Sequence, residues 1–456
     1  MSTPLQITPA SVRTFRYVSR SFDATTGTAV FTYALDHLEL YERYEFPMPA
    51  PGEDGRTGLA ARVAGFIRLL DQLFITAGLS YYKMAAPQHI RIECGSWDDR
   101  DIAAHSEILA GGLGEFCFHN NLPARLAPTV ERFAASHEAL TDLGLDAGPL
   151  VPVGGGKDSS VTIEAFRAFG LAPVQITVNR YPVIQHVIEA SGLPDLAVRR
   201  ILDPRIGELN RNGALNGHVP VTAIVSLAVA ATAVLHGHRA VVMSNERSAS
   251  EGNVSYQGVE INHQWSKSAE AEDLLAGIIR RATPELQYFS LLRPLSELSI
   301  VQRFAATCER YFDTFSSCNA AFRLDADRRV ERWCGQCPKC QFVYLALATV
   351  MDRSALLRIF GTDVFRSSSR TGFEALLGLG SWKPFECVGE SGECRVALRL
   401  VAAQPEWHDH DVVARLSAAV HAHQLWPDDA DVAAVFAQHD APGIPPEFRE
   451  LIRAGS

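Results

Sequence analysis

Val153-Gly154-Gly155-Gly156-Lys157-Asp158-Ser159 is the stretch of sequence that decides the fold of this 456-residue chain. The apolar run before it, 149–153, predicts a short buried strand, and the pattern at 160–169 predicts a helix that ends at Gly170. Three glycines between a strand and a helix leave backbone N–H groups uncovered, and the helix N-terminus adds the positive end of its dipole. We therefore expect this loop to cradle a phosphate group.

Two better-known glycine motifs do not fit the loop. A Walker A motif requires a hydroxyl residue directly after its lysine, whereas Asp158 follows Lys157, and Val151 stands at the position of its first glycine. A dinucleotide-binding fingerprint requires a third glycine where this chain has Ser159. A structural glycine turn is the remaining alternative, but turn chemistry alone does not account for Lys-Asp-Ser after three glycines.

The loop instead resembles the Ser-Gly-Gly-x-Asp-Ser motif of the PP-loop ATP pyrophosphatases, with Gly154 in place of the first serine. Enzymes of that family cleave ATP between its α and β phosphates and release AMP and diphosphate. The resemblance implies that Gly155, Gly156 and Ser159 hold the diphosphate, and that Asp158 helps to hold Mg²⁺ against it. The full set of expected nucleotide-binding residues is Gly154, Gly155, Gly156, Lys157, Asp158, Ser159, Ser160, Asn179 and Arg247.

Further strand-like runs follow this loop and alternate with helical patterns. They lie at 174–178, 197–202 and 239–244. Such β-α-β repetition predicts a parallel sheet with right-handed crossovers, in which ligands bind beyond the carboxyl ends of the strands. We therefore predict an α/β fold with a doubly wound parallel sheet of the PP-loop ATP pyrophosphatase type.

We expect three regions along the chain. Residues 1–147 mix strand patterns at 28–35 and 88–94 with a helical stretch at 59–73, which predicts an N-terminal α+β region that helps to bind the substrate. Residues 148–355 form the PP-loop domain. Residues 356–456 have helical patterns interrupted by prolines, so we expect a helical C-terminal region.

The composition of the chain bears on whether its partner is a nucleic acid or a membrane. The chain is 47% hydrophobic and 21% charged, as is usual for globular proteins, and its net charge of −10 argues against a nucleic-acid partner. The uncharged run at 219–235 approaches the length of a membrane span, but its alanines and its neighbouring strand favour a helix buried against the sheet. Met1-Ser2-Thr3-Pro4-Leu5-Gln6 has no signal-peptide pattern. We expect a cytoplasmic protein without a membrane partner.

Four of the nine cysteines are close together: Cys318, Cys334, Cys337 and Cys340. Cysteines at this density in a cytoplasmic chain indicate a metal rather than disulfides, and four thiolates suit tetrahedral Zn²⁺. An iron–sulfur cluster also takes four cysteines, but nothing else in the chain indicates a redox role, so we favour structural zinc. The other five are expected to be ordinary buried cysteines: Cys94, Cys117, Cys308, Cys387 and Cys394.

Several polar residues at the predicted ligand-binding edge are candidates for chemistry. Glu246 is suited to hold a metal or act as a base, and Arg247 to clamp a phosphate or a substrate carboxylate. His218 lies in a glycine-containing loop before a helix, where a hydrogen-bonded structural role is equally compatible with the sequence. His263 and Lys267 form a weaker pair, since an exposed loop also explains them. Together with Asp158, these are the candidate catalytic residues.

Four motifs in combination resemble the MurL family, the UDP-N-acetylmuramoyl-L-alanyl-L-glutamate epimerases of bacterial peptidoglycan synthesis. They are the loop at 154–159, the Gly-His-Val-Pro-Val-Thr run at 217–222, the Ser-Asn-Glu-Arg-Ser-Ala run at 244–249 and the Cys-x2-Cys-x2-Cys knuckle. Over about 148–350 the chain also resembles the cyano-deazaguanine synthases. The MurL resemblance implies an enzyme that uses ATP and Mg²⁺ to invert the terminal L-glutamate of a nucleotide-sugar dipeptide to D-glutamate, with release of AMP and diphosphate. It also implies a companion ligase that attaches L-glutamate.

Two other functions fit parts of the pattern. A ligase or nucleobase-modifying enzyme of the same fold would have its adenylate attacked by ammonia or an amine, and nitrogen incorporation would distinguish it. A non-catalytic nucleic-acid-binding protein with a zinc knuckle fits less well, because of the acidic charge and the complete glycine loop.

Overall fold

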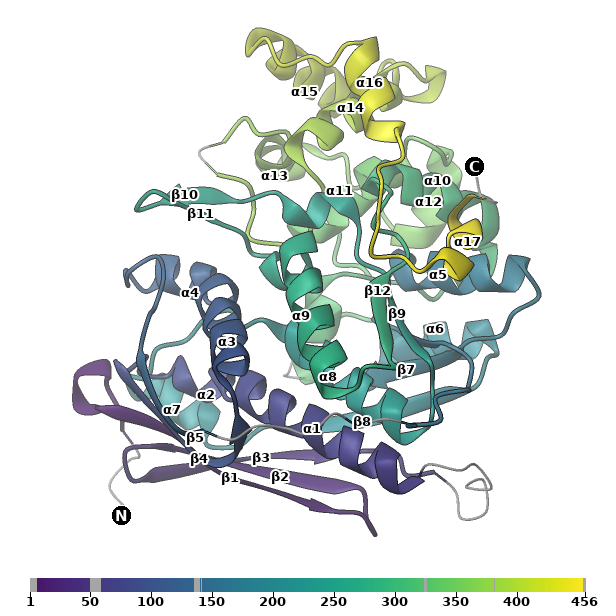
Figure 1. The fold of residues 1–456 in the computed structure, drawn as a ribbon. Helices are drawn as coiled ribbons and strands as arrows, with labels where there is room; N and C mark the ends of the chain where they lie inside the picture. The colour runs from purple at the N-terminus through teal and green to yellow at the C-terminus, as the bar shows by residue number, and fades with distance from the viewer. Residues whose placement is uncertain are drawn as a thin grey trace.

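The structure is a computed structural model that describes residues 6–49, 59–134, 140, 142–323, 326–380 and 382–453. The N-terminal hexapeptide considered above for a signal sequence lies outside the described residues, except for Gln6. One sheet of ten strands runs through the molecule in the order β12-β9-β6-β7-β8-β3-β2-β1-β4-β5, shown across the lower half of Figure 1. Most neighbouring strands are parallel; the antiparallel pairs are β1·β2, β2·β3 and β3·β8. A small separate hairpin contains β10 (Val254–Tyr256) and β11 (Val259–Ile261).

The predicted strands of the central region are all present and parallel. Their bounds are β6 (Leu150–Pro152), β7 (Val174–Val178), β8 (Asp195–Ile201), β9 (Ala240–Met243) and an additional edge strand, β12 (Gln287–Ser290). The first helix, α5 (Lys157–Ala168), begins three residues earlier than predicted, because Gly156 takes an extended conformation and acts as its N-cap. The glycine loop therefore leads directly into the first turn of α5.

Both faces of the central strands are covered. On β6, Leu150 belongs to one apolar core and the next residue, Val151, belongs to the other; Val241 and Val242 of β9 divide in the same way. This alternation is expected where a strand is buried on both sides. The helices of this region are α6 (Pro182–Ser191), α7 (Ile206–Arg211), α8 (Val221–Leu235), α9 (Ala269–Ala282) and α10 (Glu297–Thr307).

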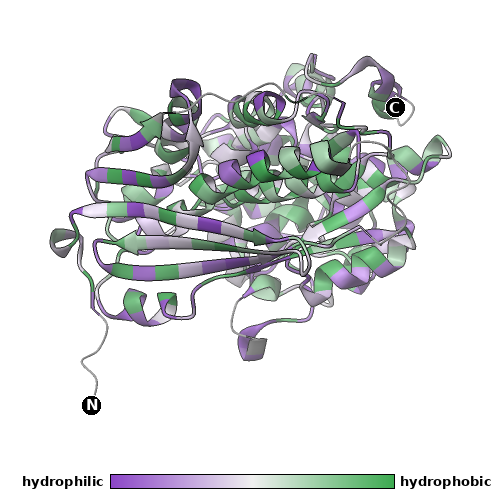
Figure 2. Ribbon diagram, turned by 60° about the horizontal axis from the view of Figure 1, so that its bottom comes forward, coloured by the Kyte–Doolittle hydropathy of each residue, from purple (hydrophilic) through white to green (hydrophobic). Residues whose placement is uncertain are grey.

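The N-terminal strands continue the same sheet. β3 pairs antiparallel with β8, and the buried side chains of Glu42 and Arg200 form an ion pair across this junction, with 2.6 Å between Oε1 and Nε. Hydrophilic and hydrophobic residues alternate along the N-terminal strands, so one face packs on helices (Figure 2). The elements are β1 (Thr14–Asp23), β2 (Thr28–Leu35), β3 (Leu38–Glu45), α1 (Leu59–Ala77), α2 (Leu79–Tyr82), β4 (His89–Trp97), α3 (Asp99–Gly112), α4 (Gly114–His119) and β5 (Thr129–Ala134).

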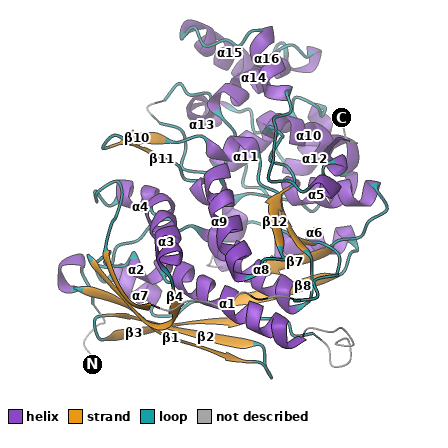
Figure 3. Ribbon diagram, in the orientation of Figure 1, coloured by secondary structure: helices purple, strands orange, loops and turns teal. Residues whose placement is uncertain are grey.

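Helices from the two regions pack on each other above the sheet. α1 lies against α8, and α3 and α9 lie beside them (Figure 3). The uncharged run at 219–235 is mostly α8 and is buried in the core, as predicted. Within the described residues one run, Ala60–Tyr82, is long and apolar enough to cross a membrane, and 78% of its most apolar window is buried inside the structure.

The C-terminal region is helical, as predicted, and lies at the top of Figure 1. Its last helix returns to pack against α5 beside the glycine loop's strand. The helices are α11 (Pro338–Leu347), α12 (Arg353–Phe360), α13 (Arg370–Leu376), α14 (Ser391–Ala402), α15 (Asp411–Ala422), α16 (Asp429–Phe436) and α17 (Glu450–Arg453).

Candidate active site

The glycine loop lies at the carboxyl end of β6, where a parallel sheet binds its ligands. Gly155 has a φ of +80°, a left-handed conformation that favours glycine. A Cβ atom on Gly154 would meet nothing within 4 Å, and one on Gly156 would meet only Ser317, 3.8 Å away. The loop therefore borders open space on its outer side.

The backbone donors of this loop are available to a ligand. Within the described part of the chain, no hydrogen bond is found from the N–H groups of Gly154, Gly155 or Gly156. No side chain caps the N-terminus of α5 either. Free N–H groups beside a helix N-terminus form a site for an anion such as a phosphate group.

Lys157 turns away from this space into the protein. Its buried Nζ forms ion pairs with Asp158 and with Glu297, at the start of α10. The two carboxylates outweigh the effect of burial and raise the pKa of Lys157, so the lysine stays charged. The side chain of Asp158 is about one third exposed. Lys157 thus holds the loop to α10 and orients Asp158.

The side chains of three other predicted nucleotide-binding residues form hydrogen bonds within the protein. The hydroxyls of Ser159 and Ser160 point back to the carbonyl of Gly156, at 3.5 and 3.3 Å. Asn179 has a positive φ, and its Oδ1 accepts a 2.8 Å hydrogen bond from the backbone N–H of Arg200 on β8. Asn179 therefore shapes the turn after β7 while its side chain is engaged with β8.

Two of the predicted catalytic histidines lie together with a glutamate from the N-terminal region. The rings of His218 and His263 are 4.5 Å apart between centroids. Nδ1 of His263 donates to Oε2 of Glu115, 2.5 Å away, and Nδ1 of His218 is 3.7 Å from the same oxygen. Glu115 is on α4, His218 precedes α8, and His263 follows β11. The fold thus assembles this group from three distant parts of the sequence.

The two imidazoles have opposite tendencies to hold a proton. Burial, followed by the charge of His263, lowers the pKa of His218 to about 4. Burial would also lower the pKa of His263, but hydrogen bonds with Cys387 and Glu115 outweigh it and raise that pKa to about 9. At neutral pH one ring is therefore neutral and the other charged. Neighbouring groups with separated pKa values are typical of a base and an acid in one site.

Lys267 connects this histidine group to the glycine loop. The Cys387 thiolate, and after it the carboxylates of Glu246 and Asp158, raise the pKa of Lys267. Its charge in turn helps to lower the pKa of His218. Glu246 is buried, and its carbonyl accepts a 2.5 Å hydrogen bond from Arg293. The structure thus brings all five predicted catalytic residues into one electrostatic network.

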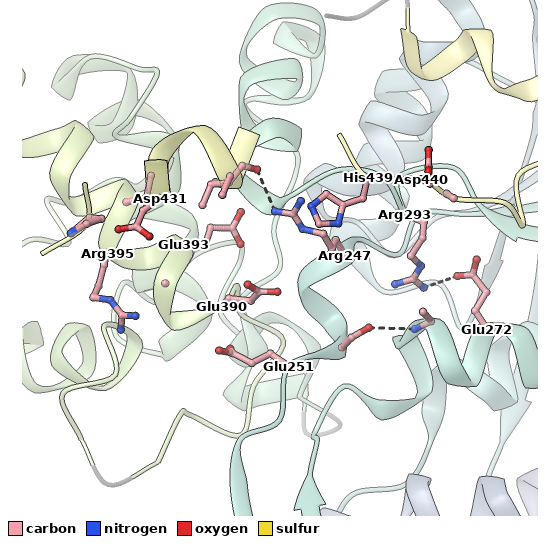
Figure 4. Close-up of a pocket in the computed structure, with 18 of the residues that line it drawn as sticks. Arg247, Glu251, Glu272, Arg293, Glu390, Glu393, Arg395, Asp431, His439 and Asp440 are labelled. Carbon is pink, nitrogen blue, oxygen red and sulfur yellow. Dashed lines mark hydrogen bonds and ion pairs between the residues drawn. The ribbon is translucent and has the colours of Figure 1, made fainter. Parts of the chain in front are cut away.

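Arg247 lies apart from this network. Its guanidinium donates to the carbonyls of Val435 and Ala437, at 3.2 and 3.1 Å, at the end of α16. It lines a cavity of about 960 Å³ beneath the C-terminal helices, which Figure 4 shows from within. Among the described residues that line this cavity, Arg247 is the one predicted site residue. Many of the others are acidic, including Glu251, Glu390 and Glu393, so the cavity is not an evident phosphate site.

The four clustered cysteines form a compact group. Sγ of Cys337 is 3.4 Å from Sγ of Cys340 and 3.9 Å from that of Cys318, and Cys334 is 3.7 Å from Cys340. Four sulfurs at about 2.3 Å from one tetrahedral zinc ion are about 3.8 Å from each other. Backbone N–H groups of residues 334, 336 and 337 also point at the sulfurs. The cluster therefore fits a single metal ion such as zinc.

Sequence reasoning missed Glu115 and Glu297, and it misassigned Cys387. Cys387 was expected to be an ordinary buried cysteine; instead it is partly exposed, and the charges of Lys267 and His263 act on its sulfur. Each of these three residues is isolated in the sequence from its partners, by more than a hundred positions in most cases. No spacing pattern of the kind that revealed the cysteine cluster was available to find them.

Fold and site together define a class: an α/β protein with an anion-binding glycine loop at the edge of a parallel sheet, a charged histidine–lysine network beside it and a four-cysteine metal cluster. A model of the MurL N-terminal domain matches residues 6–291, and a model of the MurL C-terminal domain matches residues 314–431. The chain belongs to the MurL family.

Three named relatives match most or nearly all of the chain. A protein of a Micromonospora species is 45% identical over 96% of this chain and 97% of its own length. A Salinispora tropica protein is 46% identical over 89% of this chain and 88% of its own length. A protein of Xanthomonas oryzae pv. oryzae is 40% identical over 97% of each chain. All three are named UDP-N-acetyl-alpha-D-muramoyl-L-alanyl-L-glutamate epimerase.

Proposed function

We propose that this chain is an epimerase that inverts the terminal L-glutamate of UDP-N-acetylmuramoyl-L-alanyl-L-glutamate to D-glutamate through an acyl-adenylate. The substrate is that named for its relatives, which share 40–46% of its residues. The single observation that carries the adenylate mechanism is the glycine loop, whose N–H groups lack partners within the described chain. In this proposal the loop is a PP-loop: it binds the diphosphate part of ATP, which is released when AMP is transferred to the substrate.

The loop's own residues support nucleotide binding. Gly154, Gly155 and Gly156 offer backbone donors, and the dipole of the twelve-residue α5 adds positive potential at the same point. We assign to the partly exposed carboxylate of Asp158 the role of helping to hold Mg²⁺, which would neutralise the phosphate charge. Lys157, which also pairs with Glu297 on α10, holds Asp158 in the first turn of α5.

The need for ATP follows from the substrate's chemistry. An ionised carboxylate makes the proton on the neighbouring α-carbon hard to remove, because a dianion would form. Conversion to an acyl-adenylate removes the carboxylate charge and lets the electrons of the carbanion spread onto the acyl oxygen. Water must be excluded until inversion is complete, since it would hydrolyse the activated group.

The histidine pair is our candidate for transfer of the proton. Neutral His218 can accept a proton and charged His263 can donate one, as their separated pKa values allow. Lys267 is a poor base because its neighbours keep it charged. It is better suited to stabilise negative charge that develops on the acyl oxygen, close to Glu246 and Asp158.

The remaining features fit a precursor-synthesis enzyme. We propose that the cysteine cluster holds structural zinc, since its sulfurs are close enough to surround one ion and leave little room for an iron–sulfur cluster. The proposed enzyme works in the cytoplasm on the product of an L-glutamate-adding ligase. Neither a nucleic acid nor a membrane is part of this proposal.

Replacement of Asp158 tests the mechanism. With ATP and the UDP-muramoyl dipeptide, Asp158→Ala should reduce AMP release and epimerisation together by at least about 100-fold, because the phosphate charges lose their metal. Asp99→Ala is the matched control: Asp99 is also in the first turn of a helix, with a fully exposed side chain. Near-normal turnover by Asp158→Ala would reject the nucleotide site. Incorporation of nitrogen into the product would indicate a ligase instead.

A further inference from the structure

Cys387 lies in an irregular segment that is held firmly against the loop containing His263. Nδ2 of Asn253 donates to the carbonyl of Pro384 at 2.7 Å, and the N–H of Lys383 donates to the carbonyl of Asn253 at 3.3 Å. On the other side of the cysteine, Nε2 of Gln264 donates to the carbonyl of Val388 at 3.1 Å. These bonds hold the backbone on both sides of Cys387 against the loop that contains His263.

Positive charges surround the thiol. His263, Lys267 and Lys339 all lie close enough for their positive charges to act on the sulfur. Burial raises the pKa of a thiol, but these three groups outweigh it and hold the pKa of Cys387 well below its usual value. The one carboxylate that adjoins it in sequence, Glu386, is engaged with Asn319. These cations therefore favour the thiolate form of the sulfur.

Other cysteines of the chain behave differently. Burial raises the pKa of Cys94 to about 11, and those of Cys117 and Cys308 to about 12. Cys94 is partly exposed, like Cys387, so exposure does not explain the contrast. The difference comes from the cations that the fold places around Cys387.

The cysteine faces the site proposed above. Lys267, whose charge acts on its sulfur, also interacts with Asp158 of the glycine loop, and His263 lies against His218 and Glu115. Glu115, His218 and His263 offer ligand atoms within 4.8 Å of one another, which could suggest a metal ion. Two lysines, Lys83 and Lys267, act on His218, and their positive charge opposes the binding of another cation.

We propose that the sulfur of Cys387, held beside His263, is one of the two groups that exchange the α-proton of the glutamyl residue, a role that rests on the proposed epimerase function. The α-carbon would lie between the sulfur of Cys387 and the histidine pair. When the thiolate takes the proton, the Cα–H bond breaks, an S–H bond forms, and the electron pair moves onto the acyl oxygen.

The histidine pair completes the inversion from the other face. The N–H bond of the imidazolium breaks and a new Cα–H bond forms on the face opposite the cysteine. Exchange with water then restores the thiolate and the imidazolium. Epimerisation in the reverse direction uses the same two groups with their roles exchanged.

Separation of the partial reactions tests this role. Cys387→Ser should lower epimerisation and solvent-deuterium exchange at the glutamate α-carbon by at least about 100-fold, because a hydroxyl is a far weaker base at neutral pH. Substrate-dependent ATP–diphosphate exchange, which needs only adenylation, should stay within about threefold of the native rate. Cys94→Ser is the control and should preserve both reactions. Epimerisation by Cys387→Ser within about threefold of native would overturn the proposal.

Thiol labelling and α-proton exchange without ATP give two further tests of the role of Cys387. If Cys387→Ser fails to fold, iodoacetamide at pH 6 on the native enzyme should label Cys387 before Cys94, and the dipeptide substrate should slow this labelling. Faster labelling of Cys94, or no protection by substrate, would contradict the thiolate role. If the native enzyme exchanges the α-proton without ATP, the adenylate mechanism fails, but loss of that exchange in Cys387→Ser would still support the cysteine.

Discussion

At the scale of single residues, the site depends on two neighbouring imidazoles that have different pKa values. Glu115 and Cys387 favour the charged form of one of them, His263. His263 lies between Glu115 and Cys387, whereas His218 is buried and feels the charges of His263 and two lysines. The rings touch, yet one is neutral and the other charged at pH 7. Neither ring would have this property alone in water, where a histidine titrates near pH 6.5.

The raised pKa of His263 predicts a pH-dependent contribution to stability. Because the folded-state pKa is about 9, above the usual 6.5, the charged ring stabilises the fold fully below about pH 6.5 and loses this effect as the pH rises through about 9. His263→Gln should therefore lower the free energy of unfolding more at pH 6 than at pH 10, by up to about 3 kcal/mol. Urea unfolding at both pH values measures the difference.

Glu115→Gln supplies the control for this effect. In that background His263→Gln should show a smaller pH-dependent difference, because the carboxylate that helps to keep the ring protonated is absent. An equal loss of stability at pH 6 and pH 10 in the native background would show that His263 is not protonated in the folded protein.

At the scale of elements, the cysteine knuckle joins the central region to the C-terminal helices. Cys318 begins a short 3-10 helix, and Cys337 is the N-cap of α11, a helix that is almost wholly buried. Gly335 has a φ of +64° in the turn between Cys334 and Cys337. A metal ion at the four sulfurs would fix the start of α11 and hence the helices that pack on it.

Loss of one sulfur should therefore release the metal and loosen these helices. Cys337→Ser should bind less than one zinc ion per chain, and its free energy of unfolding should fall by at least about 2 kcal/mol. Metal content can be measured by elemental analysis and stability by thermal unfolding. Cys94→Ser, which changes a cysteine outside the cluster, should keep one ion per chain. Full zinc content in Cys337→Ser would contradict the four-cysteine site.

At the scale of the whole molecule, the N-terminal region and the central region share one sheet and one site. β3 joins β8 in the sheet, α1 packs on α8, and Glu115 of α4 reaches His263. At the same interface, α3 meets the 3-10 helix that begins at Trp265: a Cβ atom on Gly111 would lie 2.2 Å from the Trp265 ring. The N-terminal region thus supports the residues from which the site is built.

Gly111→Ala should therefore damage the site from a distance. The added methyl group would push Trp265 away and displace His263 and Lys267, which flank it, at a cost of about 1–3 kcal/mol in stability and with reduced epimerisation. Gly148→Ala is the control, because a Cβ there would meet nothing within 4 Å and should change stability by less than about 0.5 kcal/mol. Native activity and stability in Gly111→Ala would show that the interface between α3 and the Trp265 helix can accept the methyl group without displacing His263 and Lys267.

The sequence by itself determined the features that depend on neighbouring positions. The strand–glycine loop–helix order, the central parallel strands, the buried α8 and the cysteine spacing are all local patterns, set by periodicity, backbone freedom and ligand geometry. Only the tertiary structure decided that the N-terminal strands extend the same sheet, that Lys157 turns inward to Glu297, and that Glu115 and Cys387 meet at His263. Proton affinities there arise from burial and charge between residues far apart in the chain, and no local pattern encodes those distances.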